Sequence, residues 1–118
     1  MSWFEVDIFN RCVEVDLHDY SHMTAMQAAR EKIKEAYEHG FRHIRLIHGS
    51  TNIQDKKDGG GSIKFALRSM LKSGELNKWV EENGSKNHRL RDESITLALR
   101  KNPKPAAGGW KEMPMDEY

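Results

Sequence analysis

The chain has 118 residues, of which 37% are apolar, and it carries one cysteine and a net charge of +1. This is the length of one globular domain with a core of its own, and the lone Cys12 excludes an internal disulfide and favours a reducing, cytoplasmic location. The apolar runs are too short for a membrane span, and the acidic start of the chain argues against a secretion signal.

Two segments at the beginning alternate apolar and polar residues, which is typical of strands with one buried face. They are residues 3–9 (WFEVDIF) and 12–18 (CVEVDLH), and Asn10 and Arg11 between them allow a hairpin. The second of these strands is expected to bury its valines and leucine and to expose its acidic residues on the opposite face.

A helix is expected next, because Ser21 and Thr24 offer caps and small or apolar side chains recur at helical spacing up to about His39. Gly40 is well placed to end this helix. Residues 42–47 (RHIRLI) then predict a buried strand.

A polar, glycine-rich loop separates this strand from a second helix, predicted at residues 62–73. Residues 76–82 and 94–100 predict two further strands, on either side of a polar stretch at 83–93. The second helix is expected to face the core with Ile63, Ala66, Leu67, Met70 and Leu71.

This order of elements predicts an α/β fold, a two-layer βαβαββ sandwich with a mixed sheet and two helices. Strands 12–18 and 42–47 should be parallel and adjacent, because a crossover helix joins them. All three prolines lie in the last 16 residues, so residues 1–102 are expected to form the domain and residues 103–118 a flexible tail.

The net charge hides an uneven distribution along the chain. Residues 1–41 carry 4 Lys or Arg and 8 Asp or Glu, residues 42–104 carry 14 and 7, and residues 105–118 carry 1 and 3. A basic middle segment between two acidic segments indicates a polyanionic partner that the total charge would not show.

Three polar side chains follow the two parallel strands. Asp16 and His18 are two residues apart and so share one face of their strand, and His48 ends the next strand. Because the carboxyl ends of parallel strands meet at one edge of a sheet, these side chains are expected to lie together. A carboxylate and imidazoles can bind a divalent metal or move a proton, although a solvated strand end with no chemical role is the alternative.

A glycine-rich turn made of Gly59, Gly60 and Gly61 leads into the second helix, and Gly49 follows His48. Backbone N–H groups at a helix N-terminus suit a phosphate, and Lys64 and Arg68 in the first turns could neutralise one. A flexible turn beside a solvated basic surface is the alternative.

Together, four segments resemble the Smr (small MutS-related) domain family over roughly residues 12–100. The segments are VDLHDY at 15–20, TAMQAA at 24–29, RLIHG at 45–49 and GGGSIKFAL at 59–67. Val15, Asp16 and His18 match the family motif L-D-x-H-G, and the motif H-G-x-G-x-G-x-L-R is matched by His48, Gly49, Gly59, Gly61, Ile63 and Lys64.

The chain departs from the family pattern in three places. Asp19 replaces the glycine of the first motif, nine residues (50–58) stand where the family usually has one, and the family's glycine-containing motif is absent before Ser94. Asp19 is either a second metal ligand or an exposed turn residue.

The resemblance implies a fold like the C-terminal domain of bacterial translation initiation factor three. It also implies binding to DNA or RNA, often branched or ribosome-associated, and endonuclease activity with Asp16, His18 and His48 as the cleavage residues. Asp16 and Asp19 would then be the ligands of a divalent metal, magnesium or manganese.

Two other functions are compatible with the sequence. One is a non-catalytic module that binds nucleic acid or the ribosome, which the basic middle segment favours. The other is a protein-interaction adaptor that uses the tail with Trp110 and Tyr118.

Overall fold

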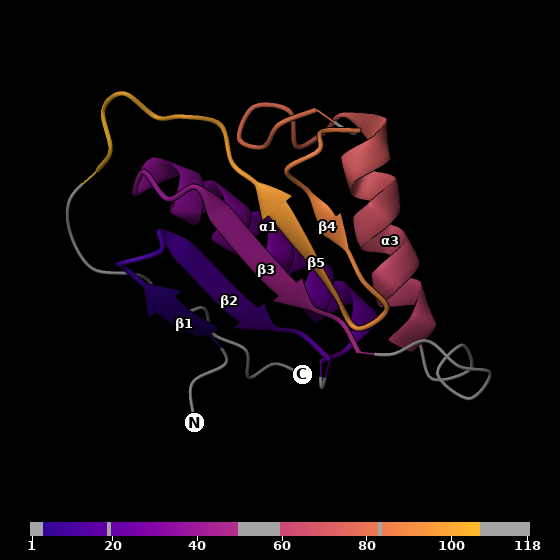
Figure 1. Cartoon of the computed structure of the whole chain (residues 1–118). Coiled ribbons are helices and arrows are strands. Elements are labelled where there is room, and N and C mark those ends of the chain that lie inside the picture. The colour runs from indigo at the N-terminus through magenta and orange to yellow at the C-terminus, as the bar shows by residue number, and fades with distance from the viewer. Residues whose placement is uncertain (1–3, 19, 50–59, 83, 107–118) are drawn as a thin grey trace.

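A five-stranded mixed sheet is the frame of the chain (Figure 1), and the computed structural model describes residues 4–18, 20–49, 60–82 and 84–106. The sheet order is β1-β2-β3-β5-β4; β2 and β3 are parallel, and every other neighbouring pair is antiparallel. The predicted α/β class and mixed sheet are confirmed. The strands are β1 (Phe4–Asp7), β2 (Cys12–Asp16), β3 (His43–Ile47), β4 (Arg89–Leu90) and β5 (Ser94–Ala98).

Two helices are described, α1 (His22–Glu38) and α3 (Gly60–Ser73). The Ser21 hydroxyl caps α1 by accepting the N–H of Thr24 at 3.3 Å, as predicted. Helix α1 connects β2 to β3 and packs against both strands and against α3, behind the sheet as seen in Figure 1. One face of the sheet is therefore covered by helices and the other is turned to the viewer.

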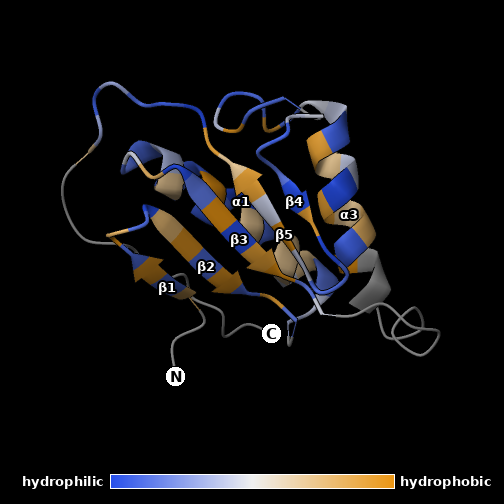
Figure 2. Cartoon of the chain, in the orientation of Figure 1, coloured by the Kyte–Doolittle hydropathy of each residue, from blue (hydrophilic) through white to orange (hydrophobic). Residues whose placement is uncertain are grey.

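The hydrophobic core lies between the sheet and the two helices. Apolar and polar residues alternate along β2 and β3 (Figure 2), so that Val13, Val15 and Leu17 are fully buried while the side chains between them face the other way. The sheet and helix residues that complete the core include Ala25, Ala28, Ala29, Ile33, Ala36, Ile44, Leu46, Ile63, Leu67, Met70, Leu71, Ile95, Leu97 and Leu99.

The strand predicted at residues 76–82 is wrong. This segment forms turns in which the N–H groups of Trp79 and Val80 both donate to the carbonyl of Leu76 at 2.9 Å. Leu76 and Val80 are buried four residues apart, a helical spacing, and Val80 makes only an isolated bridge to Leu99. The apolar residues thus reach the core from turns and not from a strand.

The polar stretch at 83–93 contains β4, a two-residue edge strand that was not predicted. The strands predicted at 3–9, 12–18 and 94–100 are shorter in the structure. The first two predicted ranges run into turns, whereas β5 ends at Ala98 and is followed by the isolated bridge of Leu99 to Val80. At the hairpin, for example, Arg11 adopts a left-handed backbone with a φ of 52°.

The end of the described chain lies against the end of α1. The side chain of Asn102 donates to the carbonyl of Tyr37 at 2.9 Å, and the N–H of Ala106 donates to the carbonyl of Glu38 at 2.6 Å. Residues 103–106 of the predicted flexible tail are thus bound to the domain, and residues 107–118 lie outside the described residues. Neither described helix has the length and apolar composition that crossing a membrane requires.

Candidate nucleic-acid interface

The two sequence motifs meet where β2 and β3 end. The register pairs Asp16 with Ile47, and the ladder continues one step further, because the N–H of Leu17 donates to the carbonyl of Ile47 at 2.8 Å. Gly49 has a φ of 88°, and a Cβ atom placed on it would lie 3.3 Å from the Cβ of His18. A glycine is therefore required at position 49 both for its backbone conformation and for the close approach of the two motifs.

Asp16 and His18 form a pair at this edge. Nδ1 of His18 contacts Oδ1 of Asp16, and the backbone N–H of His18 donates to the same oxygen at 3.2 Å. Both side chains are 46% exposed. Since an ionised carboxylate only accepts hydrogen bonds, Asp16 holds the proton of His18 on Nδ1 and makes Nε2 the nitrogen that exchanges a proton with other groups.

His48 points the other way, into the helix layer. It continues the alternation of the buried residues Ile44 and Leu46, and only 2% of its surface is exposed. The structure thus brings Asp16 and His18 into contact, whereas strand alternation turns His48 towards the opposite side of the sheet. The three predicted catalytic residues share one edge but do not share one face.

Hydrogen bonds fix both the ring and the backbone of His48. Nδ1 lies 2.8 Å from the carbonyl oxygen of Gly49, and because a carbonyl only accepts, Nδ1 carries the proton of the neutral ring. Nε2 is buried and has no hydrogen-bond partner among the described residues. In this tautomer Nε2 carries a lone pair and no proton.

Lys64 and Arg68 of α3 lie on the same side as His48. Burial lowers the pKa of His48, the positive charges of Lys64 and Arg68 lower it further, and the bond to Gly49 and the charge of Asp92 raise it. Lys64 is 9% exposed, and its Nζ donates to Oδ1 of Asp92 at 2.9 Å. Nη2 of Arg68 donates to the carbonyl of Arg91 at 3.2 Å.

Residues 91–93, between β4 and β5, organise this half of the site, which sequence reasoning missed. The carbonyl of Arg91 accepts from Arg68, and the carboxylate of Asp92 accepts from Lys64. The carbonyl of Glu93 accepts from the N–H groups of His48 and Gly49, both at 2.9 Å. The sequence offered one signal for their role, which is their place in the chain: they stand where the resembling family carries a glycine-containing motif.

The predicted glycine turn is described only in part. Helix α3 begins at Gly60, so Gly60 and Gly61 form its first turn, where the N–H groups have no acceptor within the helix. Gly59 lies outside the described residues. The N–H of Gly49 already donates to Glu93, so the role that the structure shows for Gly49 is spacing and not the donation of a bond to a ligand.

Asp19, the second expected metal ligand, also lies outside the described residues. Within the described ranges, no group of three or more His, Cys, Asp or Glu side chains is placed to hold a metal ion. Asp16 alone still suits magnesium, which usually keeps several waters and binds one or two carboxylates together with substrate phosphates.

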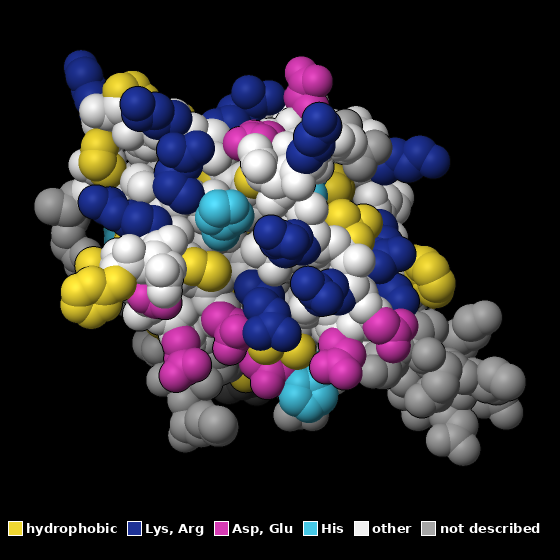
Figure 3. Space-filling view, viewed as in Figure 1, with side chains coloured by type: hydrophobic (Ala, Val, Ile, Leu, Met, Phe, Trp, Pro, Cys, Tyr) yellow, Lys and Arg dark blue, Asp and Glu magenta, His cyan; other side chains and the backbone are white. Residues whose placement is uncertain are grey.

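The face of the sheet away from the helices is divided by charge. One row of side chains runs across the strands through Glu5, Glu14, Arg45, Thr96 and Arg89, from acidic to basic. Figure 3 shows this face, with acidic side chains gathered near its lower border and Lys and Arg mainly across the centre and upper part. Phosphates are attracted to the β3, β5 and β4 half and repelled from the β1 and β2 half.

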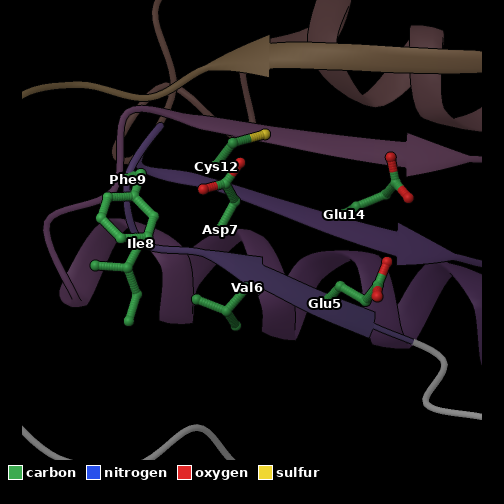
Figure 4. A pocket seen from close by; sticks show the side chains of 7 residues that line it. All are labelled: Glu5, Val6, Asp7, Ile8, Phe9, Cys12 and Glu14. Atoms are coloured by element: carbon green, nitrogen blue, oxygen red, sulfur yellow. The ribbon is translucent and has the colours of Figure 1, made fainter.

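A pocket of about 450 Å³ lies on the β1–β2 hairpin (Figure 4). The side chains of Glu5, Asp7 and Glu14 line it together with Cys12, so it is unsuited to a polyanion. Burial raises the pKa of the Cys12 thiol, and the charge of Glu14 adds to the effect. The thiol is thereby kept protonated, which argues against a role as a nucleophile.

These features define an α/β domain with a basic, histidine-containing edge, of a kind suited to phosphate-bearing ligands. The Smr domain family model matches residues 15–101, so the chain belongs to the Smr domain family. At the level of the family, this makes it a nucleic-acid-binding, nuclease-related module. Neither a curated protein nor a solved structure matches the chain. The likeness to the initiation-factor domain therefore stays a prediction.

Burial of His48 makes the stability of the domain depend on pH. Burial lowers the pKa of His48 below its ordinary value of 6.5, and the positive charges of Lys64 and Arg68 lower it further, against the opposing effect of the bond to Gly49. The unfolded chain then binds this proton more readily than the folded chain. We expect the free energy of unfolding to fall as the pH is lowered below about 6.5, and to keep falling until folded His48 is protonated.

Urea unfolding between pH 5 and 8, together with an NMR titration of the His48 ring, checks this expectation. His48→Gln identifies the resonance and should remove this part of the pH dependence. A His48 pKa at or above 6.5 in the folded protein would contradict it.

Proposed function

We propose that this chain binds structured DNA or RNA and nicks it as an endonuclease. The observation that carries the proposal is the contact between the two motifs, which sets the exposed Asp16–His18 pair at the end of β2 beside the end of β3, where His48 lies near the cations Lys64 and Arg68 of α3. Cleavage of a phosphodiester requires positive charge that binds the phosphate and a group that transfers protons to or from the reacting oxygens. Lys64 and Arg68 would supply the positive charge, and the Asp16–His18 pair would transfer the protons.

The exposed pair would perform the proton transfers. With Nδ1 held by Asp16, Nε2 of His18 can take a proton from the attacking water or return one to the leaving oxygen, and a positioned general acid or base contributes about 10²–10⁴-fold. Asp16 is the positioning group of this pair. When a magnesium or manganese ion is bound, it would supply charge neutralisation at the phosphate, with Asp16 and Asp19 as its protein ligands.

The buried half would bind and place the phosphate backbone. Lys64 and Arg68 neutralise phosphate charge, and the first turn of α3, with Gly60 and Gly61, adds backbone donors. His48 stays neutral near pH 7, because burial lowers its pKa, so we assign it a positioning role and leave the proton donation to His18.

The wild-type chain tests the proposal directly. Incubated with nicked, branched and single-stranded DNA and RNA, with magnesium, with manganese and with EDTA, it should cut at least one branched or folded substrate and bind it with an affinity that falls as salt rises. Binding without cutting under all these conditions would leave only the binding part. No binding at low salt would overturn both parts.

Binding without cleavage is the second candidate function. It is favoured by the division of the site, because His48 faces the helix layer and the Asp16–His18 pair faces the other side. A ribosome-associated RNA would be a partner of suitable charge for such a module.

A further inference from the structure

Lys64 has a partner that a binding site for phosphate would not require. Its side chain is almost fully buried, and the one polar atom, Nζ, is bonded to the carboxylate of Asp92 at 2.9 Å. Asp92 itself is 65% exposed. The cation is thus fixed in the protein while the anion lies at the solvent boundary.

The carboxylate of Asp92 resembles a phosphate group in its interaction with Lys64. Both offer charged oxygen acceptors to an ammonium group at hydrogen-bond distance. An ammonium group has three N–H donors, but the Lys64 side chain is almost fully buried, so little of it is open to a ligand. A phosphate beside the Asp92 carboxylate is also repelled by its like charge. A phosphodiester that reaches Lys64 therefore competes with Asp92.

The backbone around Asp92 is held independently of its side chain. The N–H of Arg91 donates to the carbonyl of Ser94 at 2.8 Å, and the carbonyl of Glu93 accepts from His48 and Gly49. Because these bonds are made by the backbone of the two neighbouring residues, they do not depend on the bond between the Asp92 carboxylate and Lys64.

We propose that Asp92 is an acidic latch, which occupies the phosphate position on Lys64 in the free protein and has to release it when nucleic acid binds. This inference rests on the proposed nucleic-acid function. It makes Asp92 a specificity-determining residue. Ligands with closely spaced phosphates displace the latch, whereas weakly charged ligands do not.

Asp92→Asn removes the charge of the latch and keeps its shape. The apparent affinity of a protein whose binding-competent state is partly populated is reduced by that fraction, so a latch closed in about nine tenths of the molecules predicts roughly tenfold tighter binding in the variant. Fluorescence anisotropy with a labelled branched DNA and a folded RNA measures this at several salt concentrations. Glu31→Gln, which removes one exposed carboxylate from α1, is the matched control and should change affinity little.

A double-mutant cycle separates the latch from a general charge effect. If Asp92 acts through Lys64, the gain from Asp92→Asn disappears in a Lys64→Met background. The ring of His48 gives a second readout without nucleic acid, because the charge of Asp92 raises the pKa of His48 and its removal should lower that pKa further. A merely structural role for Asp92 would not produce this combination.

Pyrophosphate, followed by the shift of the His48 resonance, distinguishes the two levels of the proposal. Tighter binding of both pyrophosphate and nucleic acid by Asp92→Asn supports the latch. Tighter pyrophosphate binding, with no nucleic-acid binding by any form of the protein, keeps the latch and overturns the proposed function. Nucleic-acid binding by the wild type that Asp92→Asn tightens no more than Glu31→Gln overturns the latch alone.

Discussion

Replacing Asp16 with asparagine is expected to lower the rate of nicking by about 10²–10⁴-fold and to leave nucleic-acid affinity within about twofold of the wild type. The amide keeps the size of the carboxylate but can offer its N–H to Nδ1 of His18, and it no longer stabilises a charged ring. The proton would then move to the wrong nitrogen for exchange with the substrate. Single-turnover cleavage of the best branched substrate, beside anisotropy with the same molecule, measures both quantities.

The matched control for this change is Asp7→Asn. Asp7 is an exposed carboxylate on the same side of the sheet, one strand away, where Asn10 holds it through two hydrogen bonds at 3.1 and 2.7 Å. Its loss removes the same charge and should not change cleavage. Equal cleavage by the wild type, Asp16→Asn and Asp16→Ala would exclude the proposed role of the pair.

The meeting of the two motifs could be predicted from the sequence because it follows from local rules. Alternation in residues 12–18, a capped helix and a buried strand at 42–47 leave a parallel β-α-β unit as the simplest arrangement, which places Asp16 beside the end of β3. The orientation of His48 was also present in the pattern. Ile44, Leu46 and His48 have the same parity, and the first two are core residues.

The third part of the site could not be predicted in this way. Residues 91–93 reach the motifs through the antiparallel pairing of β3 with β5, in which Ile47 lies opposite Ser94. A contact between residues more than forty positions apart leaves no period or spacing in the sequence. From the sequence alone, Asp92 therefore fits a solvated turn residue. Its contact with Lys64 follows only from the pairing of the strands.

The same reason explains the strand wrongly predicted at 76–82. Leu76 and Val80 fit a strand of four or five residues as well as they fit consecutive turns, since both arrangements bury them. Which of the two arrangements forms depends on whether a neighbouring strand is available to pair with residues 76–82. Here β5 is paired with β3 on one side and with β4 on the other, so little of its length is left for another strand.

The double variant Lys64→Met/Arg68→Gln is expected to weaken nucleic-acid binding at least tenfold near physiological salt. Each cation that contacts a phosphate contributes about 0.9 to the slope of log Kobs against log salt for duplex DNA, so losing two should reduce the slope by about 1.8, or about 1.4 for single strands. Methionine suits position 64, because the side chain there is almost fully buried and of similar length. Anisotropy titrations from 50 to 300 mM salt measure both the affinity and the slope.

Lys72→Met is the control. Lys72 lies exposed in the last turn of the same helix, so its substitution removes one positive charge at a distance from the site. A slope that changes no more in the double variant than in this control would exclude α3 as the phosphate-binding element.

The two halves of the site also predict opposite kinetic results. Loss of the cations should raise KM and spare kcat at saturating substrate, whereas Asp16→Asn should lower kcat and spare binding. Observing both patterns in one set of variants would assign binding to α3 and proton transfer to the end of β2, which neither variant can do alone.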